Sequence, residues 1–125
     1  MSISMLYVED NDDVRVGLAM LLEGEGRQVV ACANASAAIA VLERRRFDVL
    51  VTDVSLPGMS GIELARTLLA EHPRHWIVLC SGYAFAHGLD TLGPNVRALT
   101  KPFELEELDA LLLEITASLR EASTP

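Results

Sequence analysis

Five short apolar segments, separated by stretches whose apolar residues recur at helical spacing, constrain the fold of this 125-residue chain more than any other feature. The segments are rich in Val, Ile and Leu and are largely continuous, which is typical of strands buried on both faces of a sheet. They cover residues 3–8, 28–33, 49–52, 76–80 and 96–99. Such strands need helices above and below them, so the sequence predicts a three-layer α/β sandwich.

Apolar residues between and after these segments follow the period of an α-helix. Four clear sets occur: Val14, Leu18, Leu21 and Leu22; Ala35, Ile39 and Leu42; Ile62, Ala65 and Leu69; and Leu105, Leu108, Leu112, Ile115 and Leu119. A weaker set, Phe85, Leu89 and Leu92, lies near several poor helix formers, so a short or mobile helix is expected there. Alternating strands and helices predict a parallel sheet with right-handed crossovers, which binds ligands beyond the carboxyl ends of its strands.

The chain is expected to form one domain. Its 125 residues suffice for a hydrophobic core without metal or disulfide support, and no linker or internal repeat interrupts the pattern. We place the domain at residues 1–120 and interpret residues 121–125 as a loose tail or a truncated linker. Cys32 and Cys80 lie inside apolar segments and are expected to be buried thiols rather than metal ligands or a redox pair.

Composition argues against two classes of partner. A formal net charge of -8 disfavours direct binding to nucleic acid, which needs clustered Lys and Arg. The apolar segments are too short to cross a bilayer, and the first residues show no signal-peptide pattern, so a cytoplasmic protein without membrane insertion is expected. Arg44, Arg45 and Arg46 are interpreted as the end of an amphipathic helix, and His72 and His75 as ordinary loop histidines.

Polar residues follow four of the five predicted strands. Glu9 and Asp10 come after the first, Asp53 after the third, Ser81 after the fourth and Lys101 after the fifth. Carboxyl ends of neighbouring parallel strands converge in space, so these side chains are expected to share one rim of the sheet.

Carboxylates gathered at close range favour a hard divalent cation with oxygen ligands, of which Mg²⁺ is the usual intracellular choice. Glu9 and Asp10 by themselves are equally well explained as surface acidity in an acidic chain. The addition of Asp53, Ser81 and Lys101, the only lysine, changes this balance, because an ammonium and a hydroxyl can bind phosphoryl oxygens. The set therefore describes a phosphoryl site better than a Ca²⁺ site.

Four sequence motifs resemble those of response regulator receiver domains, such as the chemotaxis regulators. They are Tyr-Val-Glu-Asp-Asn at residues 7–11, Val-Thr-Asp-Val-Ser-Leu-Pro-Gly-Met-Ser-Gly at 51–61, Ser81-Gly82, and Lys101-Pro102-Phe103. Together they span nearly the whole chain, each at the end of an appropriate strand. The resemblance implies a flavodoxin-like doubly wound sheet with strand order 2-1-3-4-5.

The resemblance also implies roles for individual residues. Asp53 would be the phosphoacceptor, taking a phosphoryl group from a histidine kinase or a histidine phosphotransfer protein. Asp10 and Asp53 would ligate Mg²⁺ directly, Glu9 would contact the metal through water, and the backbone carbonyl of Ser55 would complete the ligands. Lys101 would neutralise charge on the phosphoryl oxygens.

Ser81 would bind the attached phosphoryl group, and the Lys101–Pro102 peptide bond would be cis. Ser55 and Tyr83 occupy positions that tune dephosphorylation in the family. Tyr83 is predicted to shield the acyl phosphate, although a surface aromatic for partner contact explains it equally well.

The chain departs from the family three residues before the lysine, where Ala98 replaces the usual Tyr or Phe of the conformational switch. Output is therefore expected to depend on backbone shifts over residues 81–92 rather than on a rotating ring. A receiver attached to a hybrid histidine kinase, which passes the phosphoryl group onward, would fit this departure. Otherwise the output would be a downstream protein partner or an attached output domain.

Two other functional classes stay open at this point. The first is an unphosphorylated interaction module with the same fold, which the intact set of acids, serine and lysine disfavours. The second is a phosphatase or phosphotransferase enzyme with an aspartyl nucleophile, which would typically carry a second aspartate two positions after the first. Ser55 occupies that position, so a switch that modifies itself is favoured over a turnover enzyme.

Overall fold

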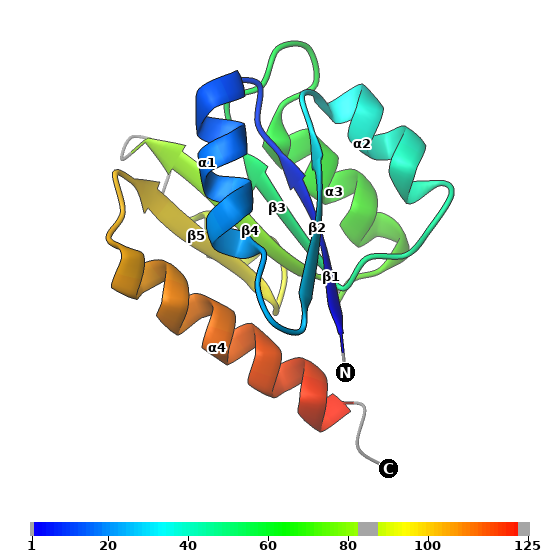
Figure 1. Ribbon diagram of the computed structural model, residues 1–125. Coiled ribbons are helices and arrows are strands. Elements are labelled where there is room, and N and C mark those ends of the chain that lie inside the picture. Colours follow the sequence, from blue (N-terminus) through cyan, green and yellow to red (C-terminus); the bar gives the residue numbers. More distant parts are fainter. Residues whose placement is uncertain (1, 83–87, 123–125) are drawn as a thin grey trace.

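In the computed structural model, which describes residues 2–82 and 88–122, five strands form a single parallel sheet (Figure 1). The strands are β1 (Ile3–Val8), β2 (Arg27–Cys32), β3 (Val49–Asp53), β4 (Trp76–Gly82) and β5 (Val96–Lys101). Their order is β2-β1-β3-β4-β5, which confirms the predicted doubly wound topology. β3 and β4 each extend one or two residues beyond the apolar segments, into the polar residues of the candidate site.

Helices cover both faces of the sheet, as predicted. α1 (Asp12–Leu22) and α4 (Leu105–Ala122) lie on one face, and α2 (Ala35–Leu42) and α3 (Gly61–Glu71) lie on the other (Figure 1). The sheet therefore separates two hydrophobic cores. Leu22, Leu108 and Ile115 belong to the first, and Ala38 and Leu64 belong to the second. Burial on both sides explains why the strand sequences are continuously apolar.

Local sequence signals begin the first three helices. The side chains of Asn11, Asn34 and Ser60 accept hydrogen bonds from backbone N–H groups three residues ahead, at 3.0, 2.8 and 3.2 Å. Each cap satisfies one of the donors that an α-helix leaves free at its first turn. α1 and α2 start soon after β1 and β2 end, whereas the loop of residues 54–60 connects β3 to α3.

One expectation about the helices needs correction, and the expected short helix before β5 is found. Arg44–46 do not lie within a helix, because α2 ends at Leu42. The backbone N–H of Arg44 donates to the Val41 carbonyl at 3.0 Å, a tightened turn that closes the helix. Within the weak helical pattern of Phe85, Leu89 and Leu92, the described residues form a 3-10 helix, η2 (Leu89–Leu92). Phe85 lies outside the described residues.

Three further expectations concern burial and chain ends. Cys32 and Cys80 are both buried, as predicted. α4 continues to Ala122, two residues beyond the expected end of the domain, and residues 123–125 lie outside the described part of the chain. Within the described residues, no helix combines the length and the hydropathy needed to span a bilayer.

Candidate functional site

Three carboxylates and a lysine lie together where β1, β3 and β5 end. Carboxylate oxygens of Glu9, Asp10 and Asp53 are all within 4.8 Å of one another. The strand register produces this convergence, since Val8 pairs with Thr52 on β3, so β1 and β3 end side by side. Residues separated by more than forty positions in sequence therefore form one acidic cluster.

Lys101 bridges two of the acids from the end of β5. Its Nζ atom lies 3.0 Å from Glu9 Oε1 and 3.0 Å from Asp53 Oδ1. Burial lowers the pKa of Lys101, but the hydrogen bonds to Asp53 and Glu9 outweigh burial, and the net effect raises this pKa. The ammonium is thus held in its charged form between the expected phosphoacceptor and a buried carboxylate.

Glu9 and Asp10 have different environments although they are adjacent. Glu9 is only 2% exposed, and its Oε2 atom accepts a hydrogen bond from the backbone N–H of Asn11 at 3.1 Å. Asp10 is exposed. Both carboxylate oxygens of Glu9 are therefore held by protein donors, whereas Asp10 projects towards solvent with its oxygens available to a ligand.

Asp53 is fixed through its backbone. Its carbonyl accepts a hydrogen bond from the Thr52 hydroxyl at 3.0 Å, and the first residue of α3, Gly61, packs directly against it. A Cβ atom at position 61 would overlap the Asp53 carbonyl. The glycine that ends the second motif therefore lets α3 approach β3 closely at Asp53.

Ser81 lies near the end of β4, 2% exposed, and its Oγ atom has no hydrogen-bond partner among the described residues. A buried hydroxyl without a partner costs about 1–3 kcal/mol, and native structures contain few such groups. An orphaned hydroxyl on the strand adjacent to Asp53 is what a site for an oxygen-rich ligand would leave when empty of that ligand.

The remaining predicted residues are placed as follows. Ser55 is exposed in the loop between β3 and α3, beside Asp53 in sequence. Ala98 lies on β5 and packs against the core on the α2–α3 face, so no ring occupies the switch position. The Lys101–Pro102 peptide bond is cis, as the family resemblance implied. Tyr83 lies outside the described residues.

Sequence reasoning missed Arg15. Its guanidinium donates to the Glu9 carbonyl at 2.9 Å and to the Asp12 carboxylate at 2.6 Å, so α1 is fastened to the end of β1 beside the acids. The spacing of Asp12 and Arg15 was a signal for a pair on one helix face. The contact with Glu9 is a product of the tertiary fold and had no sequence signal.

The donor set fits Mg²⁺. Carboxylate oxygens are the hard ligands that this ion prefers, and three of them within 4.8 Å would repel one another without a cation. Lys101 compensates part of this charge, on the side of Glu9 and Asp53. The exposed Asp10 and the solvent-facing edge of Asp53 are left for the metal, whose other ligands would include water.

Comparisons with known proteins agree on one family. The profile of the response regulator receiver domain matches residues 5–113. The chain is 36% identical over 106 residues to the response regulator receiver protein CpdR of Brucella abortus, covering 83% of this chain and 88% of CpdR. It is 34% identical over 119 residues to the sensor kinase CckA of the same organism, covering 91% of this chain but only 12% of the kinase.

Among solved structures, the receiver domain of AraT from Geobacillus stearothermophilus superimposes with a TM-score of 0.86 at 23% identity, covering 99% of this chain and all of that domain. At this identity the superposition supports the fold alone. The family profile, by contrast, spans most of the sequence and includes the acids at β1 and β3 and the lysine at the end of β5. The chain therefore belongs to the response regulator receiver domain family.

Proposed function

We propose that this receiver domain is a Mg²⁺-dependent switch phosphorylated on Asp53. The observation that carries the proposal is the contact of the Lys101 ammonium with Asp53, at 3.0 Å, on the same rim as the Ser81 hydroxyl, which has no hydrogen-bond partner among the described residues. Lys101 would supply positive charge, and Ser81 a hydrogen bond, to phosphoryl oxygens attached to Asp53. Surface acidity alone accounts for neither feature.

Asp53 would act as the nucleophile. One carboxylate oxygen forms a bond to phosphorus while the bond from phosphorus to the donor's leaving group breaks, which produces an aspartyl phosphate. Lys101 would neutralise the negative charge that develops on the phosphoryl oxygens, and Ser81 would donate a hydrogen bond to one of these oxygens after transfer. The domain would then lose the group by hydrolysis of its own acyl phosphate rather than turn over a separate substrate.

Asp10 and Asp53 would hold Mg²⁺ directly, with Glu9 acting through water and Ser55 through its backbone carbonyl. When bound, the ion would neutralise charge on the transferring group. The geometry agrees with an indirect role for Glu9, because both of its carboxylate oxygens already accept hydrogen bonds from Lys101 and Asn11. Rates of dephosphorylation would depend on Ser55 and on Tyr83, which lies outside the described residues.

The partners that we propose are a histidine kinase or a histidine phosphotransfer protein as donor, and a downstream protein or an attached output domain as recipient of the signal. Similarity to a segment of the sensor kinase CckA supports a receiver that is part of a hybrid kinase, and similarity to CpdR supports an independent regulator. The absence of an aromatic ring at Ala98 favours the former. A cytoplasmic location stays a prediction.

Intact mass spectrometry tests the proposal. The protein is incubated with acetyl phosphate, with Mg²⁺ or with a chelator, beside the variants Asp53→Asn and Asp109→Asn. Asp109 is an exposed residue of α4 far along the chain from the acids and serves as the matched control. We expect one added phosphoryl group in the wild type and in Asp109→Asn, only with Mg²⁺, and none in Asp53→Asn.

Either of two results would contradict the proposal. Equal labelling of Asp53→Asn would place the phosphoacceptor elsewhere, and no labelling of the wild type with Mg²⁺ would favour the unphosphorylated interaction module.

A further inference from the structure

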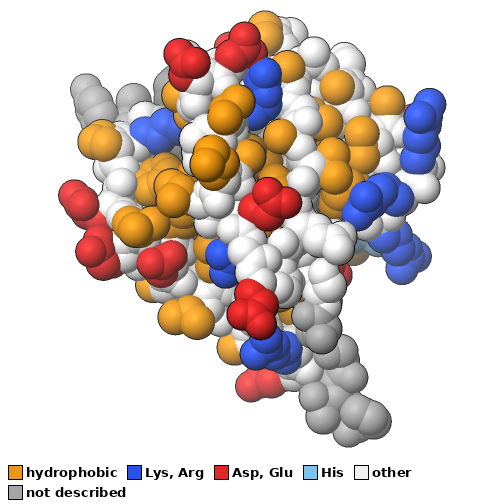
Figure 2. All heavy atoms as spheres, viewed as in Figure 1, with side chains coloured by type: hydrophobic (Ala, Val, Ile, Leu, Met, Phe, Trp, Pro, Cys, Tyr) orange, Lys and Arg blue, Asp and Glu red, His pale blue; other side chains and the backbone are white. Residues whose placement is uncertain are grey.

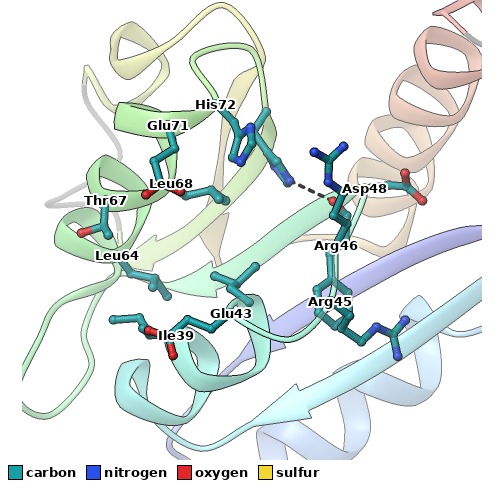
Figure 3. Close-up of a pocket in the computed structure, with 13 residues that line it drawn as sticks. Ile39, Glu43, Arg45, Arg46, Asp48, Leu64, Thr67, Leu68, Glu71 and His72 are labelled. Carbon is teal, nitrogen blue, oxygen red and sulfur yellow. Dashed lines mark hydrogen bonds between the residues drawn. The ribbon is translucent and has the colours of Figure 1, made fainter.

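A second concave site lies at the opposite end of β3 from Asp53. It is a cleft of about 380 Å³ between α2 and α3, closed at its base by the loops that enter β3 and β4 (Figure 3). This volume is at the lower end of the range of small-molecule sites, roughly 300–1,000 Å³. The cleft shares no residue with the acidic cluster.

The floor of the cleft is apolar. Leu64 and Leu68 line it from α3, Ile39 and Leu42 line it from α2, and Phe47 lies between the helices at its base. Leu64 and Phe47 are buried in the protein core, whereas Ile39 and Leu42 are half-exposed. An apolar group placed here would cover carbon surface on three sides, which stabilises binding by the hydrophobic effect.

One wall of the cleft is built from two loops that are fastened together. The two ring nitrogens of His75 lie 2.9 Å from the backbone oxygens of Phe47 and Trp76. The contact with Phe47 joins His75 to the chain segment that carries Arg45 and Arg46, which are labelled in Figure 3. The wall is therefore rigid, and His75 itself has no ring nitrogen left for a ligand.

Arg45, Arg46 and His72 supply the basic groups of this wall and rim. The Arg45 guanidinium lies over the Phe47 ring, 4.4 Å from its centre, which holds a positive charge beside the apolar floor. Neither arginine forms a salt bridge with any residue of the described ranges. Both guanidinium groups can therefore bind an anion without breaking an existing ion pair.

Charge is distributed unevenly over the molecule. The two loops at the cleft carry four of the ten Lys and Arg residues of the chain, Arg44, Arg45, Arg46 and Arg74, of which Arg45 and Arg46 line the cleft. Three of the eighteen acids, Glu43, Asp48 and Glu71, line it as well. Asp48 is already engaged, since it accepts hydrogen bonds from the backbone N–H and the hydroxyl of Ser4 at 2.8 and 3.2 Å. Figure 2 shows the basic side chains gathered at the edge of the molecule beyond the end of α2.

We propose that the cleft binds a small organic anion with an apolar body. The body would lie against Ile39, Leu42 and Leu68, and the anionic head would bind Arg46 and His72 at the rim. A purely apolar ligand would leave the arginines unused, and an inorganic anion would leave the floor exposed. The proposal does not depend on phosphorylation, so binding is tested on the unphosphorylated protein.

The test uses a matched pair of fluorescent probes with the full chain. Anilinonaphthalene sulfonate carries an aromatic body and an anionic head, and phenyl-naphthylamine carries the same body without the charge. We expect the sulfonate to bind at one site, about fivefold more tightly than the neutral probe, a difference typical of one exposed ionic contact.

Variants locate the site. Arg46→Glu should remove the preference for the sulfonate, whereas Arg66→Glu, the same charge change at an exposed position of α3 outside the cleft, should preserve it. Thr67→Trp, at an exposed lining position, should fill the cleft and abolish binding of both probes. Circular dichroism of each variant confirms that the fold is retained.

The proposal is overturned if the two arginine variants behave alike, or if folded Thr67→Trp binds the probes as the wild type does. In the latter case the probes occupy other apolar surface, such as Val16 and Met20 of α1, which are 60% and 72% exposed.

Discussion

Lys101 connects the electrostatics of the site to the stability of the fold. It pairs with Glu9, whose side chain is 3% exposed, and with Asp53, whose side chain is 12% exposed. Neither carboxylate is well hydrated, so the ammonium replaces part of the solvation that both lose on folding. The same contact that would assist phosphoryl transfer therefore also compensates buried negative charge.

This contact predicts a loss of stability at alkaline pH. Because the pKa of Lys101 is raised in the folded protein, its stabilising contribution is complete below the unfolded pKa of ~10.4 and is lost as pH rises through the folded value. Urea denaturation between pH 9 and 11.5 should show a smaller decline in the free energy of unfolding for Lys101→Met than for wild type. This pH range brackets the pKa of unfolded lysine, which is about 10.4. Burial also raises the pKa of Tyr7, which lowers stability at alkaline pH in both proteins. Only the difference between the two proteins therefore reports on Lys101.

An identical pH dependence in the two proteins would show that Lys101 contributes no net stabilisation. The comparison at neutral pH is a separate check. Removing the lysine leaves Glu9 buried without its cationic partner, so Lys101→Met should already be less stable there.

Substitution of Ser81 should affect phosphorylation and stability differently. Its hydroxyl is buried and unpartnered in the described structure, so Ser81→Ala should leave the free energy of unfolding unchanged or raise it by ~1 kcal/mol. The same substitution should reduce the yield of acyl phosphate after labelling with acetyl phosphate, because the phosphoryl group loses a donor. A marked loss of stability in Ser81→Ala would mean that the hydroxyl has a partner within the protein and is not reserved for a ligand.

At the scale of elements, α3 begins in direct contact with the backbone of Asp53, the proposed phosphoacceptor. It begins at Gly61, whose N–H donates to the Val54 carbonyl at 3.0 Å and whose Cα faces the Asp53 carbonyl. Its far end reaches the cleft through Leu68 and Glu71. A single rigid element therefore contacts both candidate sites.

Gly61→Ala should destabilise the protein by roughly 1–3 kcal/mol, because the added Cβ overlaps backbone atoms that have no freedom to move aside. Gly17→Ala is the matched control. Gly17 lies within α1 with open space around it, so alanine there should stabilise the protein by up to ~1 kcal/mol through helix propensity. Chemical denaturation of both variants measures the two effects, and equal behaviour would contradict the close approach of α3 to Asp53.

β5 carries Ala98, the position at which the sequence departs from the family motifs, and η2 lies against β5. Ala98 leaves no ring to rotate, and the described part of the connection before β5 contains a single 3-10 turn, Leu89–Leu92, where a longer helix would offer a docking face. Leu89 is buried and anchors this turn to the core. A change at Ser81 would thus reach the surface through the backbone of this segment.

On the scale of the whole molecule, the sheet divides the protein into two apolar layers that share the strands but no helix. Cys80 belongs to the layer under α1 and α4 and is 1% exposed. Burial raises the pKa of its thiol to about 12, with the Lys101 ammonium opposing this rise. Its reactivity should therefore report on opening of the whole structure.

Alkylation with iodoacetamide at pH 8, followed by intact mass, should modify Cys80 only through global unfolding, and urea should accelerate the reaction in proportion to the unfolded population. Cys32, which is 8% exposed on the edge strand β2, is the internal reference and should react first. Rapid modification of Cys80 in the native protein would show that this layer opens locally.

The number and position of the strands, the alternation with helices and the set of polar residues at the strand ends were predictable from sequence, because each depends on residues close together in the chain. Hydrophobic period, caps such as Ser60 and the four motifs are local signals. The extent of the helices was less predictable: α2 ends before Arg44, since the end depends on how Phe47 enters the core.

Only the tertiary structure decided which predicted residues touch. The hydrogen bond from Lys101 to Glu9 joins residues 92 positions apart, and its existence depends on the register of four strands, β1, β3, β4 and β5. The burial of Glu9 beside an exposed Asp10, the orphaned hydroxyl of Ser81 and the clamp formed by His75 likewise depend on packing between distant segments. Sequence patterns determine which face of an element is apolar, whereas distances between side chains arise only when the elements have packed together.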